Sequence, residues 1–178
     1  MELQQLEQLA DQYGSLLYSF CLRLTGHREN GEDLCQQAFL KAVELRERID
    51  VQRSPKSFLF ALAVGIWKNE KRKLWRRQSI LPMACPAAEE IIQKAVSREQ
   101  QPEEQILQQA LCCQVSQTVQ GLKEKDRLPV LMHYTAGFSI EEIGKILKIP
   151  PGTVKSRLYY ARKIIKKELE AKGYGTEE

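Results

Sequence analysis

The chain has 178 residues, 43% of them hydrophobic and 28% charged, which is the composition of a globular protein with one medium domain or two small ones. Its apolar runs are far shorter than the roughly 20 residues that cross a bilayer, and its acidic first residues lack the layout of a signal peptide. We therefore expect a cytoplasmic protein with no direct membrane insertion.

The side chains that usually hold metals or carry out catalysis are sparse in this sequence. Five cysteines and two histidines are present, but no Cys-x-x-Cys pair occurs, whereas a structural zinc site needs ligands at short spacing. The sequence also contains no Gly-rich phosphate loop and no nucleophile with a matching base. We therefore expect no enzymatic activity, no metal, no cofactor and no small-molecule substrate.

The net charge of +4 is unevenly distributed along the chain. Residues 51–79 hold eight Lys and Arg against one Glu, whereas residues 1–50 hold five basic residues against nine acidic ones. A second basic excess, nine against six, lies in residues 136–178, beyond an acidic stretch at residues 80–105. Two basic blocks indicate two contacts with one polyanion, or alternatively two solvated helix faces.

Apolar residues at helical spacing predict three helices within residues 1–79. The first ends at Gly26, and the second opens at Asn30, whose side chain would cap free backbone N–H groups. The third opens at Ser54-Pro55, a capping residue followed by proline at the first helical position. The predicted buried stripe of the second helix comprises Cys35, Ala38, Phe39, Ala42 and Leu45.

The segment at residues 80–102 interrupts this helical pattern. It contains three prolines and an acidic balance, which predict a flexible linker with a short helix near residues 89–96. A further helix is predicted to follow Pro102. The fold class is therefore all-α, with two small helical domains at residues 1–79 and 103–178 joined by the linker.

A helix-turn-helix is predicted in the second domain. Ser139 with Glu142 three residues later forms a capping box, which begins a helix. Pro150-Pro151 ends this helix, and Thr153 or Gly152 would cap the next one. Gly144 would provide space where the two helices cross. The inner face of the second helix would be Val154, Leu158, Ala161 and Ile165.

The outer face of that second helix is basic. Residues 153–167 contain six Lys and Arg and no acidic residue. A helix of this kind can enter the major groove, where its cations hold phosphates while Lys155 and Ser156 reach base edges. The alternative is a helical hairpin that packs on another protein. The outward residues are Lys155, Ser156, Tyr159, Tyr160 and Lys163.

Three segments resemble, in the same order, those of bacterial RNA polymerase sigma factors of the sigma-70 family. Residues 32–42 resemble the helix that binds the polymerase, and residues 58–69 resemble the helix that opens and reads the −10 promoter element. Residues 149–158 resemble the helix that reads the −35 element. In size and order the chain is similar to the extracytoplasmic-function (ECF) group.

The resemblance implies a transcription initiation factor with sigma region 2 in residues 1–79 and sigma region 4 in residues 103–178. Its partners would be core RNA polymerase, promoter DNA and an anti-sigma factor. The implied core-binding residues are Asp33, Gln36, Gln37 and Leu40. The implied −10 residues are Arg53, Lys56, Phe58, Lys68, Asn69, Arg72 and Arg76. The implied −35 residues are Ser139, Thr153, Lys155, Ser156, Arg157, Tyr159, Tyr160 and Lys163.

Several positions leave alternatives open. Trp67 and Trp75 are either core residues or aromatic supports for unstacked bases. Family members commonly have asparagine where Gly65 stands, an acid at Gln37 and arginine at Tyr160. The main alternative function is a free-standing helix-turn-helix regulator that acts as a dimer, and the second is a protein-only adaptor.

Overall fold

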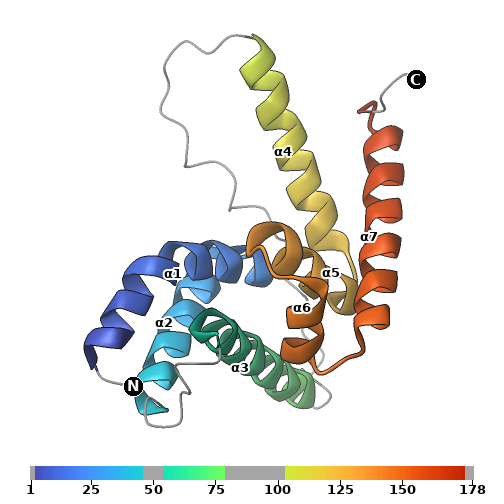
Figure 1. Ribbon diagram of the computed structural model, residues 1–178. Helices are drawn as coiled ribbons and strands as arrows, with labels where there is room; N and C mark the ends of the chain where they lie inside the picture. The colour runs from blue at the N-terminus through green and yellow to red at the C-terminus, as the bar shows by residue number, and fades with distance from the viewer. Residues whose placement is uncertain (1–2, 46–53, 79–102, 175–178) are drawn as a thin grey trace. The chain divides into compact units, whose positions relative to one another are not determined.

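The computed structural model describes residues 3–45, 54–78 and 103–174, and within these ranges all regular structure is helical (Figure 1). The chain divides into two compact units. The first contains α1 (Leu3–Thr25), α2 (Arg28–Glu44) and α3 (Pro55–Gln78). The second contains α4 (Glu103–Gly121), α5 (Glu124–Val130), the π-helical turn η2 (Leu131–Thr135), most of α6 (Ile140–Leu147) and α7 (Pro151–Ala171).

The all-α prediction is confirmed for the described part of the chain. The predicted linker at residues 80–102, with its short helix, lies outside the described residues, so the domain boundaries stay a prediction. Within the described ranges, no helix combines the length and the apolar character that crossing a membrane requires.

The first two helices form a tightly packed hairpin. As predicted, α1 stops before Gly26, which has a φ of +76° and donates its N–H to the Leu22 carbonyl at 3.0 Å. A Cβ atom at Gly31 on α2 would lie 2.7 Å from the Leu22 side chain and 2.8 Å from the Leu22 Cα. The two helix backbones therefore approach each other so closely at this point that only glycine fits.

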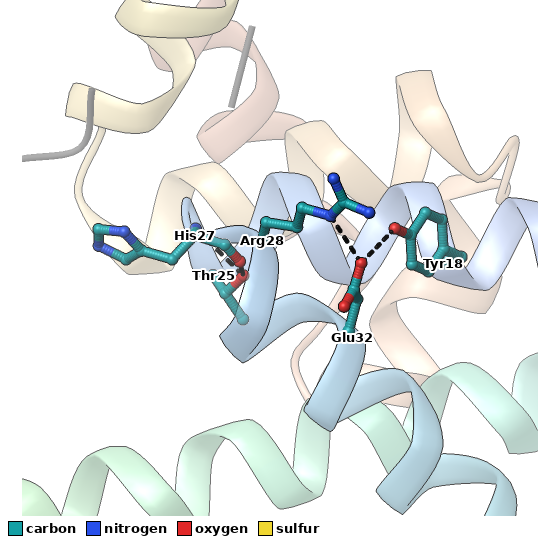
Figure 2. A network of polar contacts seen from close by, with 5 residues as sticks. All are labelled: Tyr18, Thr25, His27, Arg28 and Glu32. Carbon is teal, nitrogen blue, oxygen red and sulfur yellow. Dashed lines mark hydrogen bonds and ion pairs between the residues drawn. The ribbon is translucent and has the colours of Figure 1, made fainter. Parts of the chain in front are cut away.

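The predicted start of α2 at Asn30 is wrong, because the helix begins at Arg28 with His27 as the N-cap residue. Contacts across the hairpin explain the earlier start (Figure 2). The Thr25 hydroxyl lies 3.0 Å from the Cys21 carbonyl oxygen and 2.9 Å from the His27 carbonyl oxygen and shares its one hydrogen between them, which fixes the connection; the His27 contact is drawn in Figure 2. Asn30 therefore lies in the first turn of the helix and not at its cap.

A polar cluster also ties α2 to α1. Glu32 accepts hydrogen bonds from Arg28 Nε at 2.8 Å and from the Tyr18 hydroxyl at 2.9 Å (Figure 2). The hydrogen bond from Arg28 is the main cause that lowers the pKa of Glu32. The cluster thus secures the first turn of α2 to α1 through contacts made largely at the surface.

The core of the first unit is aromatic and aliphatic. Phe20 of α1 and Phe60 of α3 are fully buried, with ring centroids 5.0 Å apart at 56°. Cys21 and Cys35 are buried free thiols, and their mutual hydrogen bond, with burial, raises the pKa of Cys21. The predicted stripe of α2 is buried at Cys35, Ala38 and Ala42 and half-buried at Phe39 and Leu45.

A proline within the second unit shapes the contact between α5 and α7. Pro129 lies inside α5 and has no N–H, so it cannot donate to the Lys125 carbonyl as residue i+4 of a regular helix would. The Arg157 guanidinium of α7 donates to that same carbonyl at 3.2 Å. Helix α7 is thereby attached to a carbonyl that lacks its regular i+4 donor.

Candidate nucleic-acid interface

The predicted capping box at the start of α6 is confirmed. The Ser139 N–H donates to Glu142 Oε2 at 2.9 Å, and the Glu142 N–H donates to Ser139 Oγ at 3.2 Å. Phe138 and Ile143, which stand at the spacing of a hydrophobic staple, are both fully buried. Local sequence alone therefore sets where the first helix of the motif begins.

The turn between α6 and α7 is tight. The Ile149 N–H donates to the Gly144 carbonyl at 3.0 Å, and Lys148 has a left-handed φ of +57°. A Cβ atom at Gly144 would lie 2.9 Å from the Ile149 carbonyl oxygen and 3.7 Å from Pro151, so the glycine provides space for the turn itself.

The predicted cap of α7 is wrong. Pro150 is the N-cap residue and makes no side-chain cap, whereas Gly152 and Thr153 lie in the first helical turn. The Thr153 N–H donates to the Pro150 carbonyl at 2.9 Å. Because Pro151 occupies the first helical position, its fixed φ starts the helix and it has no N–H that would need a cap.

The two faces of α7 separate as predicted. The inner face is buried at Val154, Leu158 and Ala161 and half-buried at Ile165. All five residues assigned to the outer face are exposed: Lys155, Ser156, Tyr159, Tyr160 and Lys163. The described geometry is therefore that of a helix-turn-helix with an uncovered recognition helix.

Three other residues predicted at the −35 contact lie off this outer face. Ser139 is exposed and engaged in the capping box, and Thr153 is half-buried. Arg157 is half-buried and bound to the Lys125 carbonyl. Their contacts with DNA stay predictions.

The third helix of the first unit presents a basic face. Lys68, Arg72 and Arg76 follow each other at four-residue spacing; Lys68 is half-buried and the two arginines are exposed. Asn69 beside them is exposed, whereas Lys56 and Phe58 in the first turn of α3 are half-buried. Arg53 lies outside the described residues, so its predicted −10 contact stays a prediction.

Trp67 belongs to the core, which settles one of the two open assignments. Its side chain is 5% exposed, and the Lys71 ammonium lies 4.7 Å from the ring centroid. An indole held in this way is not available to support an unstacked base.

Gly65 leaves an open position on α3. The residue is exposed, and a Cβ atom built on it would have no atom within 4 Å, so nothing in its surroundings demands glycine. The space around this position would therefore admit the asparagine that is common in the family, so packing does not explain why glycine stands here.

The outer surface of α2, defined by Asp33, Gln36, Gln37 and Leu40, is accessible. Asp33, Gln36 and Leu40 are exposed and Gln37 is half-buried, and Leu40 keeps 64% of its area exposed. Val43 is 40% exposed and extends the apolar part of this surface. The prediction omitted Val43, although its spacing of three residues from Leu40 indicated the same face.

Two helical units, one of them ending in a helix-turn-helix with a basic outer face, define a DNA-binding protein. The family comparison is more specific: Sigma-70 region 2 matches residues 9–77, and Sigma-70 region 4 matches residues 114–165. The chain belongs to the sigma-70 family of RNA polymerase sigma factors, in its ECF group.

Curated relatives span most of the chain. The ECF RNA polymerase sigma factor SigW of Bacillus subtilis (strain 168) is 28% identical over 164 residues, which cover 90% of this chain and 87% of the relative. The ECF RNA polymerase sigma-E factor of Escherichia coli (strain K12) is 29% identical over 139 residues, covering 78% and 73%.

Solved structures support the same fold. The sigma factor RpoE in complex with the anti-sigma factor NepR, from Bartonella quintana, matches with a TM-score of 0.77 at 20% identity, covering 94% of this chain and 98% of that one. CnrH in complex with the cytosolic domain of CnrY matches with a TM-score of 0.66 at 19% identity, covering 96% and 90%.

Proposed function

We propose that this chain is a promoter-specific transcription initiation factor that binds core RNA polymerase and directs it to promoters through −10 and −35 contacts. The observation that carries this proposal is the order of two matched sigma regions along one chain. A free-standing dimeric regulator would need only the second of them, so that alternative is not favoured. Catalysis belongs to the polymerase, and the factor would act with it in the cytoplasm.

Each accessible surface corresponds to one part of this function. The outer surface of α2 combines an acid, amides and an exposed leucine, which suits a protein interface with the polymerase. The basic face of α3 suits the −10 strands, because cations at helical spacing can follow the phosphates of a strand. The outer face of α7 suits the major groove of the −35 duplex.

An anti-sigma factor is the further partner that we propose. Of the solved structures with this fold, the sigma factor RpoE was solved in complex with the anti-sigma factor NepR, and CnrH in complex with the cytosolic domain of CnrY. The apolar and acidic side chains on the outer surface of α2 are accessible for a competing protein in this chain too.

The decisive experiment is transcription by the reconstituted enzyme. Core polymerase supplemented with the purified chain should start transcription at a fixed position on promoters selected from a random library, and core polymerase alone should not. Stable operator binding by the chain alone, without association with core polymerase, would support the dimeric regulator instead.

Replacing Lys155 with alanine should weaken binding of the holoenzyme to its −35 duplex by about 1–3 kcal/mol, because Lys155 is exposed near the start of α7, where base edges are within reach. Lys166→Ala is the matched control, since Lys166 is also an exposed lysine of α7 but lies three turns further along. Titration of labelled duplex at fixed salt measures both variants. An equal loss of affinity in the two variants would mean that Lys155 only attracts the DNA through its positive charge and does not contact a base.

Replacing Gly65 with asparagine should increase promoter opening about two- to tenfold. The reason is that the amide could add one hydrogen bond to the displaced strand, and such a bond contributes about 0.5–1.5 kcal/mol. The space around Gly65 admits the side chain without any shift. Permanganate reactivity of unpaired thymines measures opening. Gly65→Ala controls for the gain in helix propensity; an equal increase with alanine would exclude the amide as the cause.

A further inference from the structure

Two exposed tyrosines occupy the centre of the outer face of α7. Tyr159 is 58% exposed and Tyr160 is 60% exposed, and their ring centroids are 5.6 Å apart at 74°. Such an edge-to-face arrangement is favourable for aromatic rings, so each ring limits the movement of its neighbour. Tyrosine is enriched at interfaces because it combines an apolar ring with a polar hydroxyl, so this exposed pair is suited to a contact surface.

The two tyrosines belong to different rows of the helix surface. Lys155, Tyr159 and Lys163 follow each other at four-residue spacing, so Tyr159 lies between two exposed cations. Ser156, Tyr160 and Ile164 form the next row, which carries no charge. In the first row, Lys155 near the start of the helix suits base acceptors and Lys163 further along suits the phosphate backbone, whereas the second row suits the uncharged parts of the base edges.

The side chain at position 160 limits which bases can be recognised. Guanine is read by a paired hydrogen bond from Arg or Lys, which the tyrosine ring cannot make. The apolar feature that the major groove does offer is the C5-methyl group of thymine, which aromatic and other apolar side chains contact. The Ser156 hydroxyl one turn earlier already donates to the Gly152 carbonyl at 3.0 Å, so the ring is the dominant uncharged feature of this row.

We propose that Tyr160, braced by Tyr159, recognises a thymine of the −35 element through its 5-methyl group. The inference rests on the proposed function and specifies which base the outer face of α7 selects. A protein partner for the two rings is less favoured, because the surrounding residues 153–167 carry six cations and no acid, as a polyanion requires.

Deoxyuridine in place of thymidine removes only the methyl group, which makes a sharp test. The −35 element is first selected by the reconstituted holoenzyme from duplexes randomised upstream of a fixed −10 region. Each thymine of the selected element is then replaced singly by deoxyuridine. Binding should weaken about fourfold at one or two thymines, since a buried methyl group is worth about 0.8 kcal/mol and 1.4 kcal/mol is tenfold.

The protein variants assign this effect to the ring. Tyr160→Ala should bind the thymine and deoxyuridine duplexes equally, whereas Tyr160→Phe should keep the fourfold difference because it keeps the ring. Lys155→Ala should weaken binding to both duplexes and keep the ratio. The ratio is measured within one protein preparation, so a loss of folded material in any variant does not affect it.

The outcomes separate this inference from the proposed function. Failure to associate with core polymerase, or failure to enrich any −35 sequence, would overturn both. An enriched element in which no thymine is sensitive to deoxyuridine would overturn only the methyl contact. A difference that persists in Tyr160→Ala, or a Tyr160→Ala defect confined to core association, would also overturn it; the second result would indicate a protein partner.

Discussion

Replacing Leu40 with aspartate should lower the affinity for core RNA polymerase at least about thirtyfold, because we expect Leu40 to be one of the few interface residues whose loss costs about 2 kcal/mol or more. The new carboxylate would also be transferred unpaired into the interface. Leu40 is 64% exposed on α2, so the fold of the free protein should not change. Competition against a labelled sigma factor for a limiting amount of core polymerase measures the affinity.

Leu74→Asp is the matched control for this substitution. Leu74 is a similarly exposed leucine of the same unit, at 53%, but it lies on α3 and outside the outer surface of α2. The Leu74→Asp substitution removes the same side chain and introduces the same charge as Leu40→Asp does. Unchanged core affinity in Leu40→Asp, or an equal loss in both variants, would show that α2 does not provide the contact.

Replacing Gly31 with alanine should destabilise the first unit by about 2–3 kcal/mol, the upper part of the usual cost of overpacking. The added methyl group would lie 2.8 Å from the Leu22 Cα, and a backbone atom in a packed helix cannot move aside as a flexible side chain can. For a unit of this size the midpoint of thermal unfolding should fall by roughly 10–20 °C.

The chain provides a selective signal for this measurement. Its two tryptophans, Trp67 and Trp75, both lie on α3, so tryptophan fluorescence follows the first unit in the intact protein. Gly65→Ala is the paired control: it makes the same chemical change in open space and should stabilise the unit by about 0.5–1 kcal/mol. Equal midpoints for the two variants would contradict the close approach of α1 and α2.

Features set by neighbouring residues could be predicted from the sequence. The Ser139–Glu142 capping box depends only on residues three apart, and the start of α3 at Pro55 follows from its fixed φ. The inner and outer faces of α7 follow from the helical period. The function could be predicted as well, because each of the three motifs that resemble the family is a continuous run of residues and the three occur in the family's order.

Features set by contacts between distant residues could not be predicted. The start of α2 depends on Thr25 in the connection and on contacts of Tyr18 in the preceding helix, so the capping preference of Asn30 was overridden. The need for glycine at position 31 appears only when Leu22 lies against it. Whether Trp67 is core or exposed likewise depends on packing that no local pattern encodes. The individual contacts with polymerase and DNA stay predictions because they involve other molecules.

Pro129 has a consequence for how the second unit tolerates substitution. A residue with an N–H at position 129 could complete the helical hydrogen bond to the Lys125 carbonyl, and Arg157 would then share its acceptor. We therefore expect positions 129 and 157, which are 28 residues apart, to be energetically coupled, so that the effect of a change at one depends on the identity of the other. The residue at position 125 is under no such constraint, because it contributes only its main-chain carbonyl. The outer face of α7, which we propose to carry promoter preference, can therefore diverge while this pair keeps the helix in place.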